Sequence, residues 1–153
     1  MRAAMAVLSI GLLVFSAGGA ADTTARWDEK PFFPRRPGEK VPPPAFFATT
    51  RAVPAGAEVR IKVVRCPRDA TLEVHRFIGG PVFSTGGTKY ADLSADKTLT
   101  HKLDRETTVG ITTGVGGERG RCKSVERKDG YDVLTYSFGD LGDMVLEVEV
   151  VGK

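Results

Sequence analysis

The chain has 153 residues, 41% of them hydrophobic, and a formal net charge of +3. This length suits one domain and leaves no room for a second full core. The 22 basic and 19 acidic residues are too evenly balanced for a nucleic-acid-binding protein, so we exclude nucleic acid as a partner. The sequence contains no Asn, which excludes N-glycosylation.

Residues 1–21 have the three parts of a secretory signal peptide. Arg2 gives a positive start, residues 6–15 form a short apolar run, and small residues follow up to Ala21. The alternative is an uncleaved membrane anchor, but the apolar run is too short to span a bilayer comfortably. We therefore expect cleavage after Ala20 or Ala21, a secreted or periplasmic protein, and no membrane span after cleavage.

Residues 22–52 are predicted to form an extended arm. Seven of the nine prolines lie between residues 22 and 56. Prolines lack amide donors and favour polyproline II geometry, which argues against a helix or a central strand. Two phenylalanine pairs in this segment carry so much apolar surface that we expect at least part of it to be buried.

Two interpretations of the arm remain open. The arm could lie across the domain, where its phenylalanines complete the core or cover a sheet edge. In that interpretation Phe46 and Phe47, close to the domain, are the stronger core candidates. Alternatively, the arm presents a partner-binding surface made of Phe32, Phe33, Arg35 and Arg36.

Residues 53–153 are predicted to form an all-β domain. The first strand is the clearest, because Val59, Ile61 and Val63 alternate with charged residues. Strands are expected at 58–65, 70–78, 81–84, 98–103, 107–113, 119–126, 131–138 and 143–151, with one short helical turn within 90–97. Short strands between Gly-rich turns predict a small antiparallel β-sandwich, Ig-like or jelly-roll-like. The last two strands should be adjacent and antiparallel, because only residues 139–142 join them.

Cys66 and Cys122 are the only two cysteines. An even number in an exported chain favours one disulfide, which the chain-entropy model values at about 4 kcal/mol. The alternative is a pair of free buried thiols. The absence of a Cys-x-x-Cys pair argues against a redox role.

No catalytic motif is evident in the sequence. His75 and His101 both fall in predicted strands, without the spacing of a metal site, and we expect ordinary half-exposed strand histidines. Ser84 has glycine-rich flanks, but it lacks the Gly-x-Ser-x-Gly pattern and the strand-turn-helix context of a nucleophile. We therefore expect no catalytic residues, no metal site and no cofactor.

Two groups of charged residues have both a structural and a functional interpretation. Aspartates 92, 96, 129, 132, 140 and 143 lie in or near turns, where side-chain caps explain them, although carboxylates at one end of a sandwich could also bind calcium. The basic segment 119–128 could bind an anionic glycan or surface. It could equally be a charged edge strand that resists aggregation.

Taken together, these features predict a secreted, non-catalytic β-sandwich that binds a protein or glycan partner as an accessory, interaction or inhibitory module. Two alternatives remain open. One is a small secreted hydrolase or metal-dependent enzyme with its site in the Gly/Asp-rich loops. The other is a structural envelope or surface protein that assembles through its arm.

Overall fold

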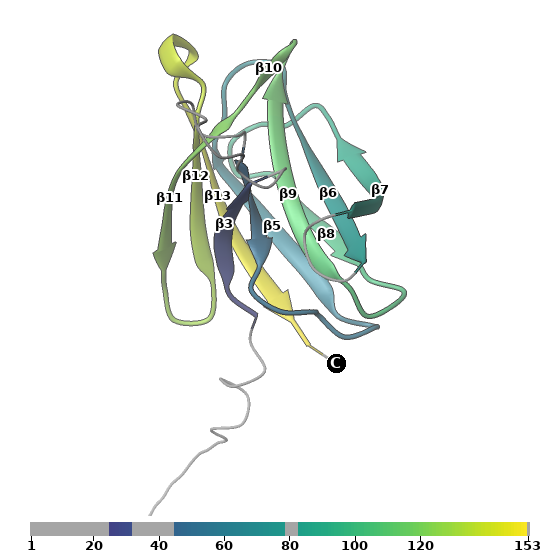
Figure 1. Cartoon of the computed structure of the whole chain (residues 1–153). Helices are drawn as coiled ribbons and strands as arrows, with labels where there is room; N and C mark the ends of the chain where they lie inside the picture. Colours follow the sequence, from purple (N-terminus) through teal and green to yellow (C-terminus); the bar gives the residue numbers. More distant parts are fainter. Residues whose placement is uncertain (1–24, 32–44, 79–82, 153) are drawn as a thin grey trace, which may run out of the picture.

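Two antiparallel sheets pack face to face in the computed structural model, which describes residues 25–31, 45–78 and 83–152 (Figure 1). The first sheet contains β3 (Trp27–Pro31), β4 (Ala45–Thr49), β6 (Ala70–Ile78), β7 (Phe83–Tyr90), β9 (Thr108–Val115) and β10 (Glu118–Arg119). The second contains β5 (Glu58–Arg65), β8 (Thr98–Lys102), β11 (Arg121–Arg127), β12 (Asp132–Ser137) and β13 (Asp143–Val151). The predicted all-β sandwich is confirmed.

The strand order brings distant segments of the chain together. The first sheet runs β3-β4-β9-β6-β7, with β10 beside β9, and the second runs β11-β12-β13-β5-β8. Thus β13 lies between β12 and β5. The β12–β13 hairpin is antiparallel, as predicted, and a 3-10 turn over Gly139–Leu141 joins its strands.

Strand β5 shows why the sequence pattern produces a sandwich. Val59, Ile61 and Val63 are fully buried between the sheets, whereas Arg60 and Lys62 point to solvent. Because successive side chains of a strand point to opposite faces, an alternating sequence buries one face and leaves the other charged. Strand β13 repeats this arrangement beside β5 in the same sheet.

Aromatic side chains join the two sheets in the core. Phe47 of β4 meets Tyr136 of β12 edge to face, with ring centroids 5.0 Å apart. The buried Tyr136 hydroxyl donates a hydrogen bond to the carbonyl of Ile111 in β9, at 2.7 Å. This contact satisfies the phenolic proton inside the core and holds the facing strands in register.

A smaller apolar cluster lies on the other face of the first sheet. Phe46 and Phe77 stack with ring centroids 5.3 Å apart, beside buried Ala48. They meet over Gly110, where a Cβ would lie 2.7 Å from each ring. The predicted core pair Phe46–Phe47 is therefore buried, but its two rings lie on opposite faces of β4.

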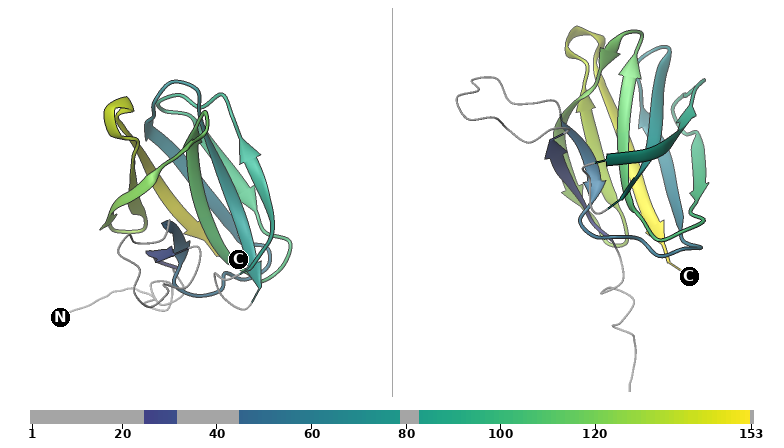
Figure 2. Two further views of the ribbon diagram at one scale, coloured as in Figure 1. Left: turned by 45° about the horizontal axis from the view of Figure 1, so that its top comes forward. Right: turned by 45° about the vertical axis from the view of Figure 1, so that its right-hand side comes forward.

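Two strands occur within the segment expected to be an extended arm, because β3 and β4 pair with each other and β4 pairs with β9. An ion cluster around Asp132, which is 1% exposed, fastens β3 to the β11–β12 hairpin. The Asp132 carboxylate accepts hydrogen bonds from Arg26 at 2.9 Å, from the Trp27 backbone at 3.0 Å and from Arg127 at 3.3 Å. Figure 2 shows β3 at the edge of the sandwich beside β11.

Three element predictions differ from the structure. Strand β7 continues through Gly86 and Gly87 to Tyr90, well beyond the predicted limits 81–84; the Glu73 side chain occupies the space that a Gly87 Cβ would need. The strand predicted at 119–126 is split at Gly120, where a Cβ would collide with Thr113 and Phe138. The helical turn expected within 90–97 is absent, because that segment contains only a bend and a turn.

Candidate functional site

A pocket of about 310 Å³ lies on the outer face of the second sheet, over strands β5 and β13. Its volume is at the lower end of the range of about 300–1,000 Å³ for small-molecule sites. We call it the β5–β13 pocket. Its lining includes Arg60, Lys62, Thr98, Asp129, Tyr131, Glu147 and Glu149.

The strand register places opposite charges side by side in this pocket. Lys62 is the pairing partner of Glu147, and Arg60 is the partner of Glu149. Arg60 is also held from its own strand by Glu58, whose carboxylate accepts from its guanidinium at 3.0 and 3.2 Å. Donors and acceptors therefore alternate over a rigid sheet rather than over a loop.

The turn between β11 and β12 supplies the aromatic side of the β5–β13 pocket. Gly130 adopts a φ of 94°, and the Lys128 amide donates to the Tyr131 carbonyl at 2.9 Å. This tight turn brings Asp129 and the half-buried Tyr131 to the pocket, beside the end of β13. The Asp-Gly turn was evident in the sequence, but its position over β13 depends on the sheet order.

A second, more polar groove of about 200 Å³ lies on the outer face of the first sheet. We call it the β6–β9 groove. Its side chains include Thr71, Glu73, Lys89, Thr112 and Arg119, and Gly114, Gly116 and Gly117 also line it. Glu73 and Lys89 are cross-strand partners of β6 and β7, so the charges are mixed here too.

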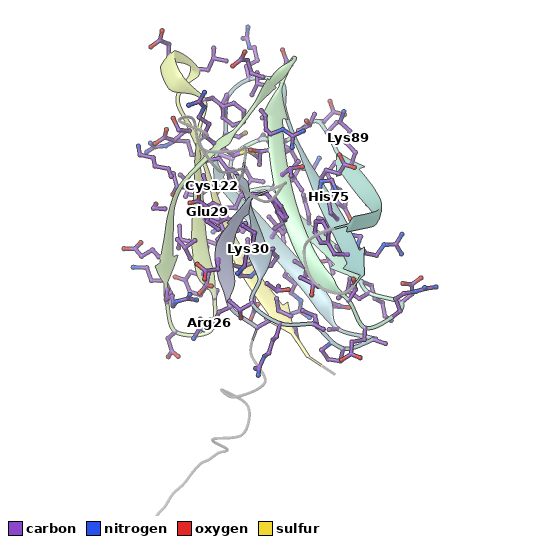
Figure 3. The ribbon with its side chains drawn as sticks, viewed as in Figure 1. Arg26, Glu29, Lys30, His75, Lys89 and Cys122 are labelled. Atoms are coloured by element: carbon purple, nitrogen blue, oxygen red, sulfur yellow. The ribbon has the colours of Figure 1, made fainter. Side chains whose placement is uncertain are left out.

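His75 lies next to the β6–β9 groove, and Figure 3 shows it near Lys89 over β6 and β7. Its Nε2 is hydrogen-bonded to the Thr112 hydroxyl at 2.8 Å. Burial lowers the pKa of His75; Arg119 lowers it further, whereas Glu73 raises it. Burial and Arg119 thus favour the neutral form of this imidazole. Within the described residues no carboxylate forms a hydrogen bond with it.

His101 has a different structural setting. Its Nδ1 is hydrogen-bonded to the Tyr90 hydroxyl at 3.0 Å, and this contact joins edge strand β8 to edge strand β7 of the opposite sheet. Burial lowers the pKa of His101, Arg76 lowers it further and Asp104 raises it. The two histidines are on different sheets and do not form one site.

The predicted disulfide between Cys66 and Cys122 is not formed, and both cysteines are free. Cys66 follows β5, whereas Cys122 is in β11, and strands β12 and β13 lie between them. At about 4.8 Å per strand the two backbones are roughly 14 Å apart. A disulfide requires Cα atoms about 4.4–6.8 Å apart. The even cysteine count could not reveal this separation.

Both thiols have raised pKa values, which favour the protonated form. Burial raises the pKa of Cys66. Burial and the nearby Glu29 carboxylate raise the pKa of Cys122 to about 12. Figure 3 shows Cys122 and Glu29 close together where β11 faces β3. A protonated thiol is a poor nucleophile and a poor metal ligand.

The aspartates considered for calcium separate into structural roles. Asp132 anchors β3, and Asp143 pairs with Lys123 at 2.8 Å. Asp92 and Asp96 adopt positive φ angles in the loop before β8. In the described part of the chain no group of three or more His, Cys, Asp or Glu side chains could hold a metal ion.

Several predictions fall outside the described residues. The signal-peptide segment 1–21 and the proposed partner-binding residues Phe32, Phe33, Arg35 and Arg36 are among them.

Ser84 lies in β7 opposite Phe77. No helix in the ranges the model describes has the length and apolar character needed to cross a membrane.

Comparisons with protein-family models, with curated proteins and with solved structures found no match to the chain. A sandwich architecture by itself does not indicate an activity, because unrelated functions use the same fold. Only the surfaces of the described residues therefore bear on the function of this protein.

Proposed function

We propose that the protein is an exported, non-catalytic binding module that recognises its partner through the β5–β13 pocket. One observation carries this proposal: a hollow on a rigid sheet face combines an aromatic side chain with adjacent donors and acceptors. Side chains on strands keep their geometry before binding, which lowers the entropic cost of recognition. The partner is a protein or a glycan.

Export rests on the signal-like pattern of residues 1–21. The free cysteines remove the second support for an oxidising compartment, since no disulfide links Cys66 to Cys122. The test is mass spectrometry of the protein from culture supernatant, periplasm and cytosol. A mature N-terminus at residue 21 or 22 outside the cytosol is expected, and an intact cytosolic chain would contradict export.

The binding proposal is tested by swapping charges across one register pair. Arg60→Glu/Glu149→Arg keeps the net charge but reverses the donor–acceptor pattern of the β5–β13 pocket. Glu73→Lys/Lys89→Glu is the matched control in the β6–β9 groove. Each protein is assayed for binding to arrays of immobilised glycans and of peptides.

We expect wild type and control to share partners that the pocket variant loses, with all three proteins equally folded by circular dichroism. The proposal fails if the pocket variant keeps every partner. It also fails if the wild type binds nothing on either array.

A second candidate is ester or amide hydrolysis at His75 and Thr112, favoured by their 2.8 Å hydrogen bond. In such a reaction the Thr112 hydroxyl attacks the carbonyl carbon, and its proton passes to Nε2 of His75 and then to the alkoxide or amine that leaves. Water then attacks the acyl-threonine, which releases the carboxylic acid and restores the Thr112 hydroxyl. The test is p-nitrophenyl acetate hydrolysis by the wild type and by Thr112→Val. Equal rates for the two proteins would exclude the dyad.

A further inference from the structure

The charges that line the β5–β13 pocket restrict the chemistry of its ligand. Two cations, Arg60 and Lys62, share the pocket with three carboxylates, Asp129, Glu147 and Glu149. Because Glu58 also pairs with Arg60, no excess of positive charge faces an incoming molecule. Because the carboxylates outnumber the cations, a strongly anionic ligand would meet more repulsion than attraction, so electrostatic steering does not favour one.

The same arrangement favours hydroxyl groups. Each hydroxyl both donates and accepts hydrogen bonds, whereas Arg and Lys only donate and an ionised carboxylate only accepts. In the β5–β13 pocket a donor and an acceptor lie next to each other twice, at Lys62 with Glu147 and at Arg60 with Glu149. Neighbouring hydroxyls on one ring can bind both members of such a pair at once.

Tyr131 supplies the apolar component. It is half-buried and lines the same pocket, and within the described residues its phenolic oxygen forms no hydrogen bond. An aromatic ring offers a flat apolar face together with a polar tip, which suits a ligand with C–H groups on one face and hydroxyls at its edge. A pyranose sugar is a ligand of this kind, because one face of its ring carries C–H groups and its edge carries hydroxyls.

We propose that the β5–β13 pocket binds a neutral carbohydrate, with a sugar ring against Tyr131 and its hydroxyls on the paired charges of β5 and β13. This inference rests on the proposed binding function and adds the class of ligand. The test below distinguishes binding of a neutral carbohydrate from binding of a peptide or of an acidic glycan.

The experiment follows backbone amide shifts of the full chain by NMR during titration. The probes are three neutral trisaccharides (maltotriose, cellotriose and N,N′,N″-triacetylchitotriose), a galacturonic acid trimer and a trilysine peptide. We expect saturable shifts at residues 60–62, 129–131 and 147–149 with at least one neutral trisaccharide. Because no net charge is neutralised, its affinity should be the same at low and high salt.

Two Tyr131 variants test the aromatic contact. Tyr131→Ala should weaken binding of that trisaccharide by about tenfold, whereas Tyr131→Phe keeps the ring and should lose less than about threefold. The control swap Glu73→Lys/Lys89→Glu should leave the affinity unchanged.

The outcomes separate this inference from the function it rests on. Tighter, salt-sensitive binding of the galacturonic acid trimer or trilysine at the same amides overturns the ligand class and keeps the binding module. Neutral-sugar shifts confined to other surfaces overturn the pocket assignment. If none of the probes binds, the carbohydrate inference is wrong, and the array comparison above then decides whether any binding function remains.

Discussion

Replacing Asp132 by Asn should lower the free energy of unfolding, because it removes a buried negative charge that holds two arginines. The carboxylate is 1% exposed and accepts hydrogen bonds from Arg26, from the Trp27 amide and from Arg127. Asn keeps one acceptor oxygen but presents an NH₂ group to a guanidinium. Removing one partner of a buried ion pair costs about 3–5 kcal/mol. The arginine side chains are 36% and 48% exposed and can turn to water, so we expect a loss of about 2–3 kcal/mol.

Urea unfolding monitored by Trp27 fluorescence measures this loss. At a typical slope for a small domain, the midpoint should fall by about 1–2 M. Asp143→Asn makes the same chemical change in an exposed pair with Lys123, and it should cost less than about 1 kcal/mol. Equal midpoints for Asp132→Asn and Asp143→Asn would refute the reasoning that the buried carboxylate fastens β3 to the hairpin.

Three further predictions concern packing, titration and thiol chemistry. Gly110→Ala should lower the free energy of unfolding by about 1–3 kcal/mol in the same assay, because its Cβ would lie 2.7 Å from two phenyl rings. Gly117→Ala is the control, since a Cβ there would meet nothing within 4 Å. Equal losses for the two variants would contradict the packing explanation. Burial lowers the pKa of His75 and of His101 in the folded state. Below about pH 6.5 the unfolded chain therefore binds more protons than the folded chain does. The free energy of unfolding should fall as the pH drops from there through the folded-state pKa values. The double variant His75→Gln/His101→Asn should flatten this fall, measured as the melting temperature between about pH 7.5 and pH 5; an unchanged slope would show that other groups cause it. Denatured protein without reductant should show both thiols, whereas native Cys122, with a pKa of about 12, should react slowly with Ellman's reagent at pH 8; no thiol in the denatured chain would mean that a disulfide exists.

The strands that the sequence located best are those with one buried and one charged face. The predicted limits of β5, β6 and β13 agree with the structure, because an alternating pattern has one register that buries its apolar set. Strand β7 was largely missed because Gly86 and Gly87 resemble a turn. Their role depends on the Glu73 and Arg76 side chains of the neighbouring strand, which would crowd a Cβ at either position.

The candidate site was predictable in its parts and not as a whole. The charged face of β5 and the Asp129-Gly130 turn could be located from the sequence. Their convergence on one pocket could not, because it requires β13 to lie between β12 and β5. The disulfide prediction was wrong for the same reason. An even number of cysteines shows that a disulfide is chemically possible, whereas the strand order determines the distance between Cys66 and Cys122.

The central position of β13 has a consequence for biosynthesis. This strand is the last of the described ones to leave the ribosome, yet β5 and β12 each require it as a neighbour. Until residues 143–151 emerge from the exit tunnel, the second sheet stays divided in two and its apolar faces remain uncovered. Nascent chains that still lack residues 143–151 should therefore expose apolar surface and bind chaperones until this strand has emerged and paired.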